Sequence, residues 1–501
     1  MQPLPEKYWN AVKAPDIPTM ISVYISLRNL PILDRDVRMT NEFLYTDCVD
    51  TAVLDVDSTY RKSNGEHQHH RVMSTLSVVA VTYFFGCGGP LGSEPIISSA
   101  GPAIGLPAML LYPLLITGPY AFIVAELCCA FPEDGGFTVW VFNSCGPFWG
   151  FQILDDYYSL SISSGFASYL VKVAIAILLT LPCLIGTRTV SRTCVLLLAC
   201  VLIPVLVFTI WGYSRARDFG DLFEVRHEMN IIHENRTDDE QVGSIKIDWA
   251  LLLNTLFWAF DGINMASVFG GEVSNPARVY PRAIAFTVAL TLLTYVIPIP
   301  AAILVDDPNW RYFNRDSYPA LADAIGGYVL KAVFAFSSCC SVAGLFVSGI
   351  FCKSFQLSGM SDVQLLPNCF ARRSTRFNAP YVSITVTLVF TIALLGIEFK
   401  ALLLMTNAFA GAVQLVIIFA AVRLRKQLPY IPRPVRVPGG TRVLAALAGL
   451  PTIVLCYIVF DTFRSVIPTL TVLAFLVPGL FCGLYERRHN QIRRNWTAER
   501  L

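Results

Sequence analysis

The chain has 501 residues, of which 54% are hydrophobic and only 15% are charged, and its formal net charge is +2. Its mean hydropathy is +0.55. Soluble proteins carry roughly a quarter charged residues, so this composition excludes a soluble domain as the main body of the chain. The near-neutral charge and the lack of a basic, stacking-rich segment also argue against a nucleic-acid partner. The sequence therefore predicts an all-α integral membrane protein that lies in a lipid bilayer.

Twelve hydrophobic segments approach the roughly 20 apolar residues that a membrane-spanning helix needs. The third and fourth share so little sequence that one of them could be shortened or re-entrant. The segments divide the chain into an amino-terminal tail (1–73), a transmembrane domain (74–486) and a carboxy-terminal tail (487–501). In order they are 74–100, 103–130, 147–166, 168–187, 192–213, 249–271, 281–304, 326–350, 380–397, 400–422, 441–461 and 464–484.

The amino-terminal tail is polar and aperiodic, which predicts disorder. His67, His69 and His70 cluster in it, but no cysteine or carboxylate spacing completes a metal site, so no metal is expected.

Lysine and arginine concentrate in alternate loops, which the positive-inside rule assigns to the cytoplasm. Both termini are then expected to be cytoplasmic. The outer loop 214–248 holds nine acidic residues, and four more lie at 306–323. These loops form either a vestibule that attracts cations or ordinary solvated surface. Asn235-Arg236-Thr237 is a glycosylation sequon on the first of them.

Two of the hydrophobic segments are interrupted. The first contains four glycines and a proline between Gly86 and Glu94, which a continuous helix does not tolerate. The sixth places Asp261, Gly262 and Asn264 at mid-membrane depth. Irregular backbone occurs at that depth only where it lines a cavity or is buried in protein.

The interrupted segments are the first members of two successive sets of five. Paired broken helices at matching positions indicate a transporter with a five-plus-five inverted repeat and a substrate site between the repeats. The alternative is that glycine and proline merely kink packed helices.

Acidic residues inside the membrane sharpen the first interpretation, because a buried carboxylate there is functional by default. Asp261 lies in the second break, Glu94 follows the first, and Asp155 with Asp156 lies in the third segment. Each could instead be a structural acid, and Glu94 could cap the outer half of the first helix.

The first break suits an ammonium group better than a carboxylate, because Pro90 removes an N–H donor and Glu94 repels anions. Trp258 and Phe260 could stack on a cation or an alkyl chain, or simply pack.

Several motifs resemble those of the amino acid–polyamine–organocation superfamily, and most closely its polyamine uptake branch of plants and trypanosomatid parasites, which is similar to L-type amino acid transporters. The resemblance spans roughly residues 74–486. The motifs are Gly88-Gly89-Pro90-Leu91-Gly92, Ala125-Glu126, Phe131-Pro132-Glu133-Asp134-Gly135-Gly136, Gly146-Pro147-Phe148-Trp149-Gly150-Phe151-Gln152, Leu253-Asn254-Thr255-Leu256-Phe257-Trp258 and Gly271-Glu272-Val273-Ser274-Asn275-Pro276.

The resemblance implies twelve helices, alternating access, and specific roles for residues at the motif positions. Residues expected to line the substrate are Gly88, Gly89, Gly92, Trp258 and Asp261, with Asn407 as a further pocket candidate. Glu272, with Asn275 and Pro276, would form the cytoplasmic gate. Glu126 is a candidate for gating or proton coupling, or else a carboxylate at the membrane edge.

Two features depart from the resemblance. The region between Gly146 and Arg188 is shorter than in relatives, which puts the third helix and its acids in doubt. The sixth-helix break reads Ala259-Phe260-Asp261-Gly262, where plant relatives carry an asparagine- and aromatic-rich stretch. Substrate specificity can therefore differ.

The leading hypothesis is a proton-coupled plasma-membrane transporter of polyamines such as putrescine and spermidine. The alternatives are a transporter of cationic or neutral amino acids, and a nutrient sensor that binds ligand without moving it. No cofactor is expected, and an enzyme is not expected, because no soluble segment carries a catalytic constellation.

Overall fold

The computed structural model describes residues 71–145, 166–216, 219–229, 242–305, 309–314, 317–363, 365–394, 399–428, 431–464 and 469. The third predicted segment and nearly all of the last lie outside these residues, as do the histidine cluster, Asp155, Asp156 and Asn235. Every other predicted segment coincides with one or more helices.

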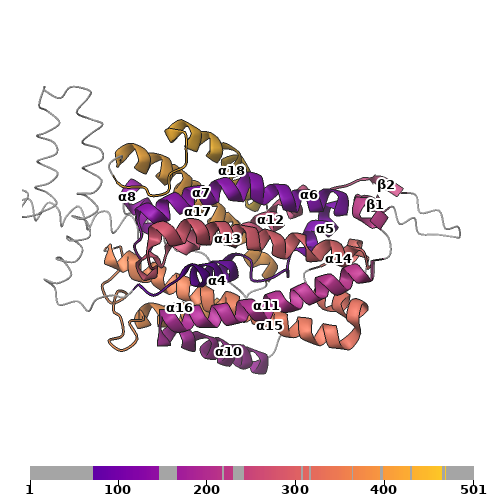
Figure 1. The fold of residues 1–501 in the computed structure, drawn as a ribbon, viewed down its shortest axis with the longest axis horizontal. Coiled ribbons are helices and arrows are strands. Elements are labelled where there is room, and N and C mark those ends of the chain that lie inside the picture. The colour runs from indigo at the N-terminus through magenta and orange to yellow at the C-terminus, as the bar shows by residue number, and fades with distance from the viewer. Residues whose placement is uncertain are drawn as a thin grey trace, which may run out of the picture. The chain divides into compact units, whose positions relative to one another are not determined.

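The chain is built almost entirely of helices (Figure 1). In order these are α4 (Thr75–Gly86), α5 (Glu94–Ala100), α6 (Pro102–Tyr112), the π-helical η1 (Pro113–Thr117), α7 (Gly118–Ala130), α8 (Phe137–Cys145), α10 (Phe166–Ile185), α11 (Thr187–Ser214), η3 (Phe219–Phe223), α12 (Trp249–Phe260), η4 (Ile263–Ser267), η5 (Gly270–Glu272), α13 (Pro276–Val296), α14 (Pro298–Ile303), η6 (Trp310–Tyr312), α15 (Ser317–Asp362), α16 (Tyr381–Leu394), α17 (Phe399–Gln427) and α18 (Gly440–Thr462).

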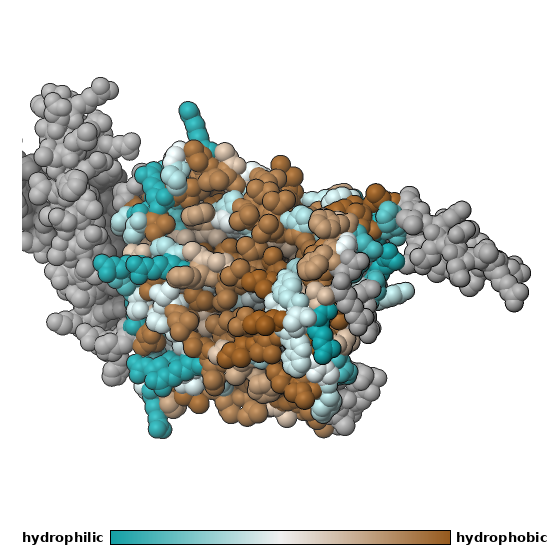
Figure 2. Space-filling model, turned by 45° about the vertical axis from the view of Figure 1, so that its right-hand side comes forward, coloured by the Kyte–Doolittle hydropathy of each residue, from teal (hydrophilic) through white to brown (hydrophobic). Residues whose placement is uncertain are grey.

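The helices expose an apolar surface that water would not tolerate. Along α11, Leu196, Ile203, Leu206 and Ile210 are each between 57% and 65% exposed. Figure 2 shows a broad apolar band with hydrophilic residues toward both ends. Six helices in the described ranges are long and apolar enough to span a membrane, and three shorter helices are also apolar. Helices satisfy their own backbone groups in lipid, so the chain is a multi-pass membrane protein.

The loop that follows α11 packs on one end of the helical domain. Its strands β1 (His227–Met229) and β2 (Val242–Ile245) pair antiparallel, a small departure from the all-α expectation. The Arg226 N–H donates to the Ala100 carbonyl (3.2 Å), and the Asp248 N–H donates to the Ser99 carbonyl (3.0 Å). This predicted outer loop therefore packs on the carboxyl end of α5 (Figure 1).

Residues that enter the first helix lie at the opposite end. The N–H groups of Val72 and Met73 both donate to the Glu272 carbonyl at 2.9 Å, and Ser274 N donates to the Met73 carbonyl at 3.0 Å. The start of α4 is thereby tied to the segment between α12 and α13.

Three helix boundaries correct the sequence-based expectation. α8 was not predicted, because Phe137–Cys145 lies between the glycine-rich motif at 135–136 and the breaker pair Gly146-Pro147. α11 begins at Thr187, so Arg188 and Arg192 belong to its first turns and not to a preceding loop. α15 extends beyond 326–350 in both directions and bends at Gly327, where φ is 65°.

Candidate functional site

Both predicted interruptions are confirmed. The first helix stops at Gly86 and resumes as α5 at Glu94, leaving residues 87–93 without helical structure. The second stops at Phe260, after which Asp261 is extended (φ −82°, ψ 177°) and Gly262 is left-handed (φ 89°). Gly262 meets this requirement without steric cost because it has no Cβ.

The two interruptions lie directly against each other. A Cβ built on Gly86 would lie 2.5 Å from the carbonyl oxygen of Asp261. At the other end of the break, a Cβ on Gly92 would lie 2.6 Å from Cζ3 of Trp258. Residues 86–92 therefore run antiparallel to residues 258–262, and at Gly86 the two backbones approach too closely for any residue with a Cβ.

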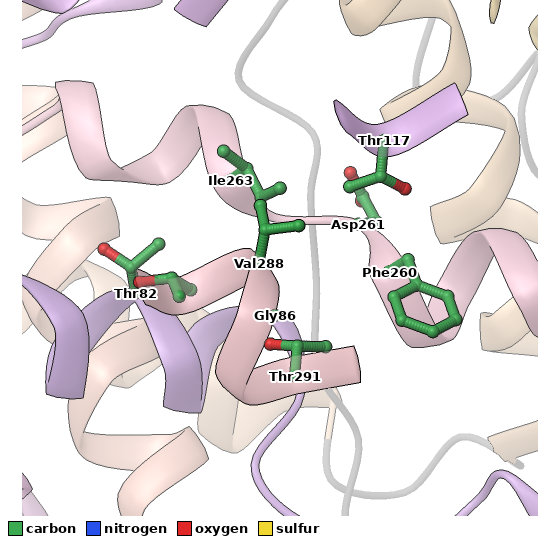
Figure 3. A pocket seen from close by; sticks show the side chains of 9 residues that line it. Thr82, Gly86, Thr117, Phe260, Asp261, Ile263, Val288 and Thr291 are labelled. Atoms are coloured by element: carbon green, nitrogen blue, oxygen red, sulfur yellow. The ribbon is translucent and has the colours of Figure 1, made fainter. Parts of the chain in front are cut away.

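A small cavity of about 10 Å³ lies beside Asp261 (Figure 3), which is room for about one water molecule. Figure 3 shows Thr117 next to Asp261, and Phe260 just before it in the chain. The cavity is lined by Thr82, Gly86, Thr117, Phe260, Asp261, Ile263, Thr287, Val288 and Thr291.

Two hydroxyl groups in this lining are available to a ligand. Thr82 and Thr287 are 1% and 3% exposed, and their hydroxyls have no hydrogen-bond partner among the described residues. Buried polar groups are nearly always paired, so the cavity is a polar site that a ligand or water would complete.

The Asp261 carboxylate is held from across the domain by α17. The side-chain amide of Gln414 donates a hydrogen bond to Oδ1 of Asp261. Sequence reasoning missed Gln414 and named Asn407 instead. Helix periodicity could have pointed to Gln414, because residue 414 lies two helical turns beyond residue 407 and therefore on nearly the same helix face.

Asn407 does not line this cavity. Its side-chain amide donates to the Asn254 carbonyl at 3.0 Å, and the Asn254 amide in turn donates to Asp461 Oδ2 at 2.9 Å. These three residues form a separate polar chain that joins α17, α12 and α18.

Phe260 lies in an aromatic cluster. Its ring centroid is 6.1 Å from that of Tyr112, in a stacked arrangement, and 5.4 Å from that of Tyr295, edge to face. Phe260 is 4% exposed, so in this conformation its ring packs against these neighbouring rings. Phe260 directly precedes Asp261 in the sequence. The buried Tyr120 hydroxyl also has no hydrogen-bond partner among the described residues.

Glu94 is completely buried at the other end of the first break. It is the first residue of α5, and its Oε2 accepts a hydrogen bond from the Gly92 N–H at 2.6 Å. A carboxylate at a helix amino terminus is favoured by the helix dipole. The capping interpretation therefore has a geometric basis, and the same carboxylate lies next to the Gly92–Trp258 contact.

Gly88 and Gly89 face away from Asp261, toward α15 and α11. The Ser341 hydroxyl of α15 donates to the Gly88 carbonyl, and a Cβ on Gly89 would lie 3.1 Å from that same hydroxyl oxygen and 3.4 Å from Val201. Among the predicted substrate residues that the structure describes, Asp261 and Phe260 alone line the cavity.

The gate candidate Glu272 belongs to a buried charged cluster at the end where α4 begins. Arg373 donates to Glu272 Oε1 at 2.9 Å and also pairs with Asp134. The Gly271 N–H donates to Asp134 Oδ1 at 2.8 Å. Sequence reasoning identified Glu272 as a gate residue and missed Arg373 and Asp134, which lie in other loops.

This cluster holds two acids and one base. Burial raises the pKa of Asp134, an effect that Arg373 opposes and Glu272 reinforces. The two carboxylates raise the pKa of the Arg373 guanidinium against the lowering effect of burial. Burial, reinforced by Glu272, therefore makes Asp134 easier to protonate than an exposed aspartate.

Glu126 is held by a second buried cluster. Arg425 Nε donates to Oε1 at 2.7 Å, Arg433 Nε lies 3.2 Å from the same oxygen, and the Val437 N–H donates to Oε2 at 2.9 Å. Burial lowers the pKa of Arg433, and Glu126 opposes that shift. Such a pair ties α7 to the end of α17 and to the loop before α18, which fits the membrane-edge interpretation of Glu126.

The fold and the site define a multi-pass helical membrane transporter with two facing helix interruptions. The family model for amino acid permeases matches residues 156–481, which is more than half of the chain. The chain therefore belongs to the amino acid permease family, and the expectation of a transporter in place of an enzyme is confirmed.

Curated relatives cover most of the chain. It is 30% identical to a probable polyamine transporter of Arabidopsis thaliana, over 84% of this chain and 87% of the relative. It is 28% identical to polyamine transporter RMV1 of the same plant, over 81% and 84%. A gamma-aminobutyric acid permease of Bacillus subtilis is 21% identical over 70% and 79%. The predicted family resemblance is confirmed.

Proposed function

We propose that this chain is a secondary transporter of polyamines, such as putrescine and spermidine, and that Asp261 binds a substrate ammonium group. The observation that carries the proposal is the position of this carboxylate, in a helix interruption and beside a cavity with two unpartnered hydroxyls. The polyamine transporter relatives support the substrate class.

The chemistry of the site favours a cation. An ionised carboxylate inside a membrane domain is costly unless an opposite charge or a strong hydrogen bond compensates it. Gln414 supplies one hydrogen bond to Asp261. A substrate ammonium would bring an opposite charge to this carboxylate, and the neighbouring rings of Phe260 and Tyr112 would favour it through cation–π attraction.

A diamine suits the two ends of the break. The Asp261 backbone lies at the Gly86 end of the interruption, and the Glu94 carboxylate lies at the Gly92 end. A polyamine carries ammonium groups at both ends of a flexible chain. Glu94 and Asp261 would each neutralise one of them, while Trp258 would cover the alkyl portion.

The cavity limits what the present conformation can hold. A volume of about 10 Å³ accepts one water and not a diamine. Transport under this proposal requires the two interruptions to separate, as they would if the domain opens alternately to each side of the membrane.

We also propose the finer features of the transporter architecture for this chain. These are twelve helices in a five-plus-five inverted repeat, cytoplasmic termini, and a plasma-membrane location. The Asp134–Arg373–Glu272 cluster would be the cytoplasmic gate. Coupling to protons is included because a proton can neutralise Asp261 or Glu94 when the substrate leaves.

The test is uptake of radiolabelled putrescine in cells that lack polyamine uptake, comparing the wild-type chain with Asp261→Asn. Loss of a charge-assisted contact is worth roughly 1.5–3 kcal/mol, so uptake at low substrate concentration should fall by about tenfold or more. The matched control is Asp461→Asn, which makes the same chemical change in the polar chain with Asn254. Unchanged uptake by Asp261→Asn would remove this residue from the site.

Amino acid transport remains the second candidate, because the matched family model is that of amino acid permeases. Competition by arginine or leucine, stronger than that by unlabelled putrescine, would favour it. A nutrient sensor would bind ligand in proteoliposomes without flux, and that result would contradict both transport proposals.

A further inference from the structure

A groove of about 600 Å³ lies between α11 and the segment that leads into α4. It is distinct from the cavity beside Asp261 and shares no lining residue with it. Its lining residues are Val72, Ser77, Arg188, Ser191, Arg192, Val195, Leu196 and Ala199.

Positive charge gathers at one end of this groove. Arg188 and Arg192 lie one turn apart in the first turns of α11, and both are exposed. Within the described parts of the chain, no hydrogen bond or ion pair engages either guanidinium, and none of the eight lining residues is acidic. α11 begins after Gly186 without a side-chain cap, so its amino-terminal N–H groups add positive potential.

A buried hydroxyl lies at the same end of the groove as the two arginines. Ser191, between the two arginines, is 6% exposed, and its hydroxyl has no hydrogen-bond partner among the described residues. A buried hydroxyl without a partner is unusual, and this one lines the groove. It would donate to an anion that also contacts the guanidiniums.

The rest of the groove is apolar. Val195, Leu196 and Ala199 continue the same face of α11, at spacings of three and four residues. From residue 188 to residue 199 the helix rises by about 16 Å. Leu196 is 65% exposed. A ligand that fills this groove therefore carries an anionic head and a hydrocarbon chain.

We propose that this groove binds an anionic phospholipid. The phosphate would be held by Arg188, Arg192 and the Ser191 hydroxyl, since guanidinium groups recognise phosphate oxygens in a two-pronged geometry. One acyl chain would follow Val195, Leu196 and Ala199. Basic pockets between transmembrane helices have this character where they bind acidic lipid headgroups.

A lipid in this groove would also affect the start of α4. Val72 and Ser77 form the other wall of the groove, and the Val72 N–H is bonded to the Glu272 carbonyl. A bound lipid would therefore hold the start of α4 against α11, next to the charged cluster around Arg373.

The experiment measures binding of short-chain phosphatidic acid to the purified full-length protein in a neutral detergent, by native mass spectrometry and by the shift in unfolding temperature. The wild-type chain should bind one saturable equivalent. Arg188→Gln combined with Arg192→Gln should weaken binding by about tenfold or more. Ser191→Ala should weaken it by several-fold without any change of charge.

The matched control is Arg278→Gln with Arg282→Gln, an exposed pair with the same spacing near the start of α13 and outside the groove. Equal weakening by both double variants would reduce the effect to bulk charge and overturn the proposal. Glycerol phosphate tests for a free-phosphate site, and phosphatidylcholine tests for a chain-only site. Competition by either one as strong as that by phosphatidic acid would also overturn it.

Should the arginine variant fail to fold, Ala199→Trp serves as a second test, because it fills the apolar half of the groove. Unchanged lipid binding by a folded Ala199→Trp protein would contradict the proposed path of the acyl chain.

Discussion

Gly86→Ala tests the contact between the two helix interruptions. The added Cβ would lie 2.5 Å from the carbonyl oxygen of Asp261, a backbone atom that cannot rotate away. Carbon and oxygen normally approach to about 3.3 Å, so the two segments must separate by about 0.8 Å. Such overpacking costs about 1–3 kcal/mol, whereas alanine gains at most about 1 kcal/mol over glycine in a helix.

The strain falls on the segment that holds Asp261, so it should appear in transport more than in folding. A penalty of about 1–3 kcal/mol corresponds to a roughly 5- to 150-fold loss of uptake at low substrate concentration. The assay is initial putrescine uptake, normalised to the amount of protein at the cell surface. The control is Gly449→Ala in α18, where a Cβ would meet nothing within 4 Å. Wild-type uptake by Gly86→Ala would refute the close contact of the two breaks.

Three further predictions concern the buried charges. Arg373→Gln leaves Asp134 and Glu272 buried without their cation, a loss worth about 3–5 kcal/mol, so Cys129 nearby should react faster with a maleimide in a background without other cysteines; an unchanged labelling rate would contradict a gating role. Because burial raises the pKa of Asp134, the cluster should be most stable at acidic pH and weaken as the pH rises through that pKa, so the unfolding temperature should depend on pH more in the wild-type chain than in Asp134→Asn. Glu126→Gln should lower stability by about 3–5 kcal/mol while transport per folded molecule is kept, as measured by thermal unfolding and uptake together; lost transport in a stable protein would instead support proton coupling at Glu126.

Residues around the helix breaks show how far local sequence signals reach. Four glycines and a proline crowd into the segment from Gly86 to Glu94, and together they disfavour a helix because they lack either a Cβ or an N–H donor. Such signals identified the two breaks and most of the helices, but they did not show that Gly86 touches the Asp261 carbonyl.

The partners of the acidic residues could not be predicted from local sequence signals. Gln414 is 153 residues from Asp261, Arg373 is 239 residues from Asp134, and Arg425 is 299 residues from Glu126. No periodicity or motif within one segment carries information about such pairs.

The sequence alone determined that the chain is a helical membrane protein, where its helices break, and which acids lie inside the membrane domain. These properties depend on hydropathy and backbone chemistry over about 20 neighbouring residues. Only the tertiary structure decided that Asp261 lies beside a polar cavity while Glu126 lies in an ion pair with arginines. Burial and pairing depend on which helix packs against which, and that arrangement comes from contacts across the whole chain.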